Sequence, residues 1–135
     1  MLIGIDPLLT GELLWRLDAM GHGDTLLVSD AHFPLFENVG SRLALPGIRG
    51  PQAVRAVTSV FPLDEGICAW VMDAPSAADA VLSELRNAAH LQPENVTSLG
   101  REAFYARSRT ASLLVRTGET RPFGNILLTK GLVTS

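Results

Sequence analysis

Short apolar segments alternate with amphipathic helical segments along the chain, and this alternation limits the folds that it can adopt. Apolar runs bounded by turn residues are typical of buried strands, whereas apolar residues that recur every three or four positions indicate helices. Strands are predicted at 25–30, 42–45, 67–72, 96–97, 112–117 and 125–129, and helices at 10–20, 50–62, 76–90 and 101–109. We therefore predict a single α/β domain over residues 1–135, with a central β-sheet covered by helices.

Residues that commonly begin or end helices support these boundaries. Thr10 can cap the first helix, and Gly21 is expected to end it in the left-handed conformation. Pro51 suits the first turn of the second helix. Ser76 followed by Asp79 resembles a capping box at the start of the third helix.

The composition is that of one domain with a well-filled core. Hydrophobic residues make up 47% of the 135 residues and charged residues 19%, so the domain should need neither disulfides nor a structural metal. The mean hydropathy of +0.23 fits a core that is covered on both faces, and in addition we expect some surface to be covered in a homo-oligomer. Cys68 is the only cysteine, and its apolar neighbours predict a buried, unreactive thiol.

The charge pattern argues against nucleic acid as a partner. The formal net charge is -3, and the Lys and Arg residues are scattered, without a basic run. Residues 1–6 have neither the basic nor the long apolar region of a signal peptide, and no stretch approaches the roughly 20 apolar residues of a membrane span. No membrane partner is expected, and the cytoplasm is the predicted location.

Gly21, His22, Gly23 and Asp24 form the first cluster that can carry chemistry, at the corner between the first helix and the first strand. Glycine on both sides lets the backbone turn sharply and leaves the imidazole open to a ligand. A histidine here can instead bond to the end of the preceding helix and interact with its dipole. The residues alone leave both interpretations open.

Asp30 and His32 form the second cluster, directly after the first apolar strand. Ligands of α/β sheets gather at such strand ends, where a carboxylate can accept hydrogen bonds from two hydroxyl groups. The alternative is that Asp30 caps backbone amides in a turn. His22, Asp30 and His32 are a possible metal-ligand set by type, but their spacing matches no helix-borne zinc motif, and we predict no metal.

The segment 118–131 is the third cluster. Glycine and proline mark a turn into an apolar strand, with Asn125 expected to be exposed at its first residue. This pattern alone predicts a hairpin. It is not a phosphate-binding loop, because no glycine-rich turn opens a helix after a strand here.

Taken together, these clusters resemble the L-fucose mutarotase and D-ribose pyranase family nearly from end to end. The motifs are MGHGD at 20–24, SDAHFP at 29–34, REAFYAR at 101–107, TGE at 117–119 and GNILLTKG at 124–131. Each is short, but their order over a chain of this length is specific. Arg101 and the run DAHFP at 30–34 are closer to the fucose branch.

The resemblance implies an α/β fold of the same family, no cofactor, and a ring-shaped homo-oligomer, often a decamer, with sites shared between neighbouring subunits. It places the family's proton donor on His22. The sugar-binding positions fall on Asp30, Arg101, Phe123, Gly124 and Asn125, with His32 and Tyr105 as supporting residues. Phe123 stands where the family usually has tyrosine, so the ring is kept and the hydroxyl is lost.

By this resemblance the chain is expected to be an isomerase, a mutarotase that interconverts the anomers of L-fucose or a related sugar. Histidine suits the task because its unperturbed pKa of about 6.5 lets it give and take protons near neutrality. Two alternatives stay open: a D-ribose pyranase, and a sugar-binding or transport-accessory protein without catalysis. His32 is the other candidate acid–base group. The residues do not identify the sugar.

Overall fold

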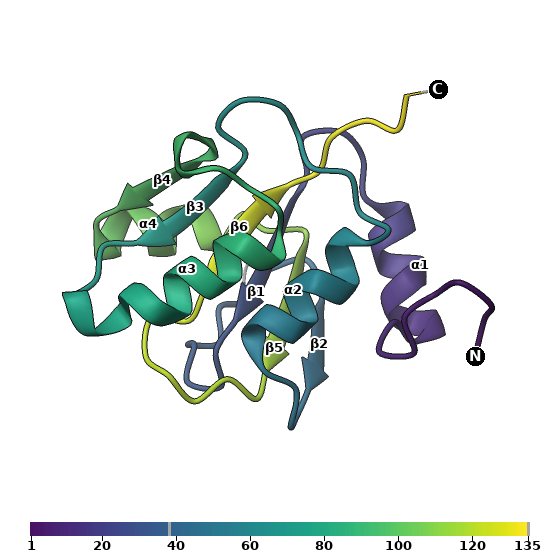
Figure 1. Ribbon diagram of the computed structural model, residues 1–135, viewed down its shortest axis with the longest axis horizontal. Helices are drawn as coiled ribbons and strands as arrows, with labels where there is room; N and C mark the ends of the chain where they lie inside the picture. The colour runs from purple at the N-terminus through teal and green to yellow at the C-terminus, as the bar shows by residue number, and fades with distance from the viewer. Residues whose placement is uncertain (38, 135) are drawn as a thin grey trace.

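The computed structural model describes residues 1–37 and 39–134, and it shows one β-sheet with helices on both faces (Figure 1). The strands are β1 (Thr25–Ser29), β2 (Arg42–Leu45), β3 (Ala69–Met72), β4 (Val96–Leu99), β5 (Leu113–Thr117) and β6 (Ile126–Thr129). The helices are α1 (Gly11–Ala19), α2 (Gly50–Thr58), α3 (Asp79–Ala88) and α4 (Arg101–Ser108), with 3-10 turns at Ser76–Ala78 and Pro93–Asn95. The predicted α/β fold with a covered central sheet is confirmed.

The sheet is mixed, and β6 is the strand that reverses direction. Its six strands lie in the order β2-β5-β1-β6-β3-β4. β1, β2 and β5 are parallel, as are β3 and β4, whereas β6 is antiparallel to both of its neighbours. Val28 of β1 lies opposite Ile126, and Thr25 lies opposite Thr129. The carboxyl end of β1 therefore lies beside the amino end of β6.

Alternate residues of β1 face two separate cores. Leu26 and Val28 pack with residues of α1, α2 and α3, whereas Leu27 packs with Phe104 of α4 on the other face. In Figure 1, α2 and α3 lie on the near face of the sheet and α4 lies on the far face. A strand that is covered on both faces reads as a continuous apolar run, which is why the strands were visible in the sequence. Cys68 is buried as predicted, and this burial raises the pKa of its thiol.

The predicted left-handed stop at Gly21 is wrong. Met20, the residue that follows α1, is already extended, and the positive φ falls on Gly23, at 90°. The reason is a turn that closes after the helix, because the backbone N–H of Gly21 donates to the Asp24 carboxylate at 2.7 Å. His22 therefore lies inside a short turn held by Asp24.

One predicted helix start is confirmed and another is wrong. The Thr10 hydroxyl accepts a hydrogen bond from the backbone N–H of Leu13, as an N-cap should. Ser76 and Asp79 form no capping box, because a 3-10 turn with Pro75 at its N-cap precedes α3 and has no side-chain cap. Among residues 1–37 and 39–134, no helix is long and apolar enough to cross a bilayer.

Candidate functional site

A cavity of about 260 Å³ opens at the end of the sheet where the carboxyl ends of β1 and β3 lie. Its walls come from the segments after β1 and β3, from α4, and from the segment before β6. The lining residues are Asp30, His32, Phe33, Pro34, Met72, Arg101, Tyr105, Pro122, Phe123 and Asn125. Most of the residues singled out from the sequence thus meet in one place, with Gly124 in the same wall segment and His22 elsewhere.

Asp30 and Asn125 form a buried pair in the cavity wall, each only 4% exposed. The Asp30 backbone N–H donates to Asn125 Oδ1 at 2.8 Å, and Asn125 Nδ2 donates to Asp30 Oδ2 at 3.2 Å. The expectation that Asn125 is exposed is wrong, because its amide is occupied by Asp30. Each carboxylate oxygen has more than one acceptor site, so Asp30 can still accept a hydrogen bond from a hydroxyl group in the cavity.

His32 is the histidine that lines the cavity. Its backbone N–H donates to Asp30 Oδ1 at 2.9 Å, and its ring Nε2 lies 3.3 Å from the carbonyl oxygen of Thr120. A carbonyl can only accept, so this hydrogen bond requires the proton on Nε2 and leaves Nδ1 as an acceptor in the neutral ring. His32 therefore both orients Asp30 and presents a titratable group to the cavity wall.

Arg101 and Tyr105 lie one turn apart at the start of α4. The Arg101 guanidinium lies 5.8 Å from the centre of the Tyr105 ring. That ring packs edge-on against Phe33, with 5.7 Å between the ring centres. The aromatic contacts hold the arginine close to the cavity, where its five N–H donors suit an oxygen-rich ligand.

Phe123 has an unusual backbone, with φ at 65°. Bulky residues rarely adopt this left-handed conformation. Gly124 follows at a point of close approach, since a Cβ there would lie 3.0 Å from Glu119 Cγ. The N–H of Asn125 then donates back to the Phe123 carbonyl at 2.8 Å, which closes a tight turn. This turn presents the Phe123 ring and the Asn125 amide to the same cavity.

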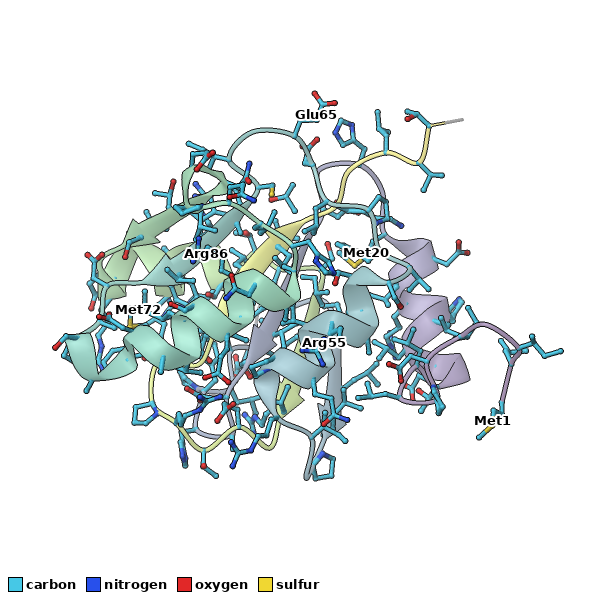
Figure 2. The ribbon with its side chains drawn as sticks, viewed as in Figure 1. Met1, Met20, Arg55, Glu65, Met72 and Arg86 are labelled. Carbon is cyan, nitrogen blue, oxygen red and sulfur yellow. The ribbon has the colours of Figure 1, made fainter. Side chains whose placement is uncertain are left out.

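His22 lies at the opposite end of the sheet, before the amino end of β1. It precedes β1 and Asp30 follows it, so the two ends are roughly 16 Å apart at the usual rise per strand residue. The His22 side chain is half exposed, and its Nε2 lies 3.2 Å from Asp64 Oδ1. In Figure 2, the label of Glu65, the sequence neighbour of Asp64, marks the end of the sheet near His22. The label of Met72, which lines the cavity, marks the other end. In one chain, His22 and the cavity do not meet.

The sequence interpretation missed Asp64. It follows a turn with no recognisable motif, and its pairing with His22 spans 42 residues. A carboxylate bonded to one ring nitrogen fixes the orientation of the imidazole.

The sequence interpretation also gave no role to Glu119 and Arg121. Glu119 is 1% exposed, and it accepts from Arg121 Nε at 3.0 Å and Nη2 at 2.9 Å. The hydrogen bond from Arg121 is the main cause that lowers the pKa of Glu119 to about 2, against the opposing effect of burial. The same pairing, with a further contact to Glu84, raises the pKa of Arg121. Both groups are therefore charged at neutral pH.

Within one chain, the three residues considered from the sequence as a metal-ligand set do not come together. His22 lies at one end of the sheet, and Asp30 and His32 lie at the other. Within residues 1–37 and 39–134, no three His, Cys, Asp or Glu side chains are grouped as ligands of one ion. The chemistry that the cavity offers is hydrogen bonding to hydroxyl groups and contact with an aromatic ring.

Comparisons with known proteins show related chains of the same fold. A family model described as the RbsD / FucU transport protein family matches residues 3–133. The fucose mutarotase of Streptococcus pneumoniae, solved in complex with L-fucose, is 30% identical with a TM-score of 0.88, over 98% of this chain and 100% of that one. FucU from Bifidobacterium longum is 30% identical with a TM-score of 0.83, over 97% and 99% of the two chains.

A more distant structure shares the fold. RbsD of Bacillus subtilis, solved with D-ribose, is 20% identical with a TM-score of 0.81, over 99% of this chain and 100% of that one. At this identity the likeness concerns the arrangement of the elements alone.

Proposed function

Because the chain belongs to the RbsD / FucU family, we propose that it is a monosaccharide mutarotase that interconverts the α and β anomers of L-fucose or a related sugar. The observation that carries the proposal is the cavity in which the buried pair of Asp30 and Asn125 lies beside the Phe123 ring. Its volume of about 260 Å³ suits one sugar, since pockets for drug-sized ligands span roughly 300–1,000 Å³.

The cavity offers a matching group for each part of a monosaccharide. Asp30 accepts hydrogen bonds from hydroxyl groups, and Asn125 fixes the carboxylate that does so. Arg101 donates to a hydroxyl or to the ring oxygen. The Phe123 ring packs against the apolar C–H face, although it lacks the hydroxyl of a tyrosine.

Mutarotation needs only proton transfer between two oxygens of the sugar. A base takes the proton of the anomeric hydroxyl, the bond between C1 and the ring oxygen breaks, and the ring oxygen takes a proton. C1 is then an aldehyde, which rotates about the C1–C2 bond and recloses as the other anomer. No electrons are transferred to a second molecule, so no cofactor is required. A single imidazole can take the first proton and give the second.

We assign this imidazole to His22 of a neighbouring subunit. The half-exposed ring and its contact with Asp64 support the assignment, because the ring is accessible and oriented at the surface. A homo-oligomer, as in the decameric rings that the resemblance implies, would bring it to the cavity of the next chain. The cytoplasm, where a lone thiol such as Cys68 stays reduced, fits such an enzyme.

A second candidate for the proton-transferring group is His32. It lines the cavity of its own chain, and the hydrogen bond to Thr120 leaves Nδ1 as an acceptor. Loss of catalysis altogether, with sugar binding retained, is the third possibility, and the absence of a hydroxyl at Phe123 favours it. A pyranase acting on D-ribose would use the same groups on a different sugar.

Saturation-transfer NMR on L-fucose, D-galactose, L-rhamnose and D-ribose tests the proposal. A mutarotase accelerates exchange between the anomeric protons, whereas a binding protein only broadens the sugar signals. We expect His22→Asn to slow the exchange by at least about 100-fold with sugar binding retained, and His32→Asn to slow it less than tenfold. Anomer exchange that is equally fast in the parent chain and in His22→Asn would overturn the assignment.

A further inference from the structure

The Phe123 ring lies between two cavities. It lines the site cavity, and it also lines a second, mostly apolar cavity of about 190 Å³ with Val81 of α3. The ring also packs against both cores, but it has open space on two sides. Its place in the wall of the site therefore depends on the backbone that carries it as well as on packing.

The backbone of Phe123 is in a conformation that phenylalanine rarely adopts. The φ of Phe123 is 65°, in the left-handed region. Non-glycine residues remain in this region only where the surrounding structure imposes it. Pro122, which precedes it, has a fixed φ and no N–H to donate. The question is which neighbours impose the conformation.

The residues on both sides of this turn are anchored to one buried carboxylate, that of Glu119. Before the turn, Arg121 donates its backbone N–H to Glu119 Oε2 at 3.1 Å and its guanidinium to both oxygens. After the turn, Gly124 packs so closely on Glu119 that an added Cβ would lie 3.0 Å from Cγ. The chain between these two fixed points has little freedom.

Glu119 is itself tied to three parts of the fold. Its side chain packs against Gly50 at the start of α2, where an added Cβ would lie 3.6 Å from Glu119 Cβ, and its partner Arg121 pairs with Glu84 on α3. The Glu119 carbonyl accepts from the N–H of Ala31, next to Asp30, at 2.8 Å. The turn that carries Phe123 is therefore held by the same part of the fold that carries Asp30.

We propose that Glu119 and Arg121 are positioning residues that hold Phe123 in its left-handed conformation and so set the aromatic wall of the sugar site. This inference rests on the proposed function for its effect on the sugar, but not for its effect on the turn. Neither residue needs to touch the sugar. A role confined to folding stability would lower the melting temperature without changing how the folded protein binds.

The test compares Glu119→Gln and Arg121→Lys with the parent chain. Glu119→Gln removes the charge at nearly constant size, and Arg121→Lys keeps the charge but loses the two-pronged guanidinium contact. The matched control is Glu94→Gln, on the exposed 3-10 turn at Pro93–Asn95. We expect both test variants to raise KM for L-fucose at least tenfold with kcat within threefold, and the control to stay within twofold of the parent in both.

A double-mutant cycle shows whether the effect passes through the ring. If Glu119 acts by placing Phe123, adding Glu119→Gln to Phe123→Ala should change KM less than twofold, because the ring is already gone. If the full tenfold effect persists in the Phe123→Ala background, the proposal is overturned. Should Glu119→Gln not fold, Arg121→Lys carries the same cycle.

A readout without sugar separates this inference from the proposed function. In the parent and both variants, amide chemical shifts of Phe123, Gly124 and Asn125 report the turn directly. We expect large shifts confined to this segment. If folded Arg121→Lys keeps the parent's amide shifts, the inference fails whatever the enzyme does. If the parent exchanges no anomers but the shifts move, the proposed function fails and the positioning role stands.

Discussion

Two buried carboxylates at the same end of the sheet differ in what they can still bind. Glu119 is matched by a guanidinium that bonds to both of its oxygens. Among the residues that the structure describes, the hydrogen-bond donors to the Asp30 carboxylate are uncharged: the amide of Asn125 and the backbone N–H of His32. A charge paired with an opposite charge has little to gain from a ligand, whereas a charge held by dipoles still attracts donors. Asp30 is therefore suited to binding and Glu119 to holding the wall.

Replacing Asp30 tests this distinction. Asp30→Asn removes a charged acceptor, and a hydrogen bond to a charged group contributes about 1.5–3 kcal/mol. We expect KM for L-fucose to rise by roughly 10- to 150-fold, as follows from that range. The control is Asp18→Asn on the exposed face of α1, where KM should not change. An unchanged KM in Asp30→Asn would remove Asp30 from the sugar site.

The low pKa of Glu119 predicts how stability depends on pH. Because pairing lowers the pKa from 4.5 to about 2, the carboxylate stabilises the fold fully above pH 4.5. This stabilisation, on the order of 3 kcal/mol, is lost as the pH falls from 4.5 to 2. Urea unfolding at pH 5 and pH 2.5 measures it. Between these pH values the parent should lose more stability than Glu119→Gln, and equal losses would contradict the pairing.

At the scale of elements, the sequence was informative where a single physical rule acts. The apolar runs at 25–30 and 112–117 became the inner strands β1 and β5, because burial on both faces requires continuous apolar residues. The outer strand β2 at 42–45 instead alternates exposed and half-buried residues. Helix ends were less predictable. Gly21 suits a left-handed stop by type, but the Asp24 carboxylate captures its N–H, and such local competition is not visible in residue types.

The carboxyl end of α3 has a histidine, His90, in a backbone conformation that favours glycine. His90 has a φ of 58°, its N–H donates to the Asn87 carbonyl, and the N–H of Leu91 donates to the Arg86 carbonyl. This pair of hydrogen bonds is a Schellman motif, in which glycine is the usual left-handed residue. Histidine carries a Cβ that glycine lacks, and the left-handed conformation is strained for it.

His90→Gly should therefore stabilise the protein. Relief of the strain outweighs the greater freedom of glycine in the unfolded chain, and we expect a gain of about 0.5–1 kcal/mol in the free energy of unfolding. Thermal and urea unfolding measure it. His90→Ala keeps the Cβ and serves as the control, which should show no gain. If alanine stabilises as much as glycine, the strain is not the cause.

At the scale of the whole molecule, the pairing of the strands brings the motif residues together, and this pairing is not visible in the sequence. Asp30, Arg101 and Phe123 were identified as motif residues, and their meeting in one cavity follows from the antiparallel pairing of β1 with β6 and from α4 beside β3. The partners Asp64 and Glu84 were not identified, because each pairs across a long stretch of chain and lies in no motif. Tertiary pairing of this kind has no periodic trace in a single sequence.

The same geometry separates His22 from the cavity, and it makes a prediction about mixed oligomers. If each site joins His22 of one subunit with Asp30 of the next, His22→Asn and Asp30→Asn chains should each show little anomer exchange alone when L-fucose is well below the parent's KM. A site in a mixed oligomer works when an Asp30→Asn chain supplies the histidine and a His22→Asn chain supplies the carboxylate. With random assembly at equal amounts this holds for about a quarter of the sites, so co-expressed variants should regain about a quarter of the parent's anomer exchange.

The control is a mixture of two variants that both alter the cavity of the sugar-binding chain. His32→Asn and Asp30→Asn both alter one cavity wall, so a mixture of the two should only average the activities of the separate chains. Recovery in the first mixture and none in the second requires a site made by two chains. If the His22→Asn and Asp30→Asn mixture regains no exchange although the oligomers contain both chains, the site is not made from His22 of one chain and Asp30 of the next, and the assignment to a neighbouring subunit is overturned.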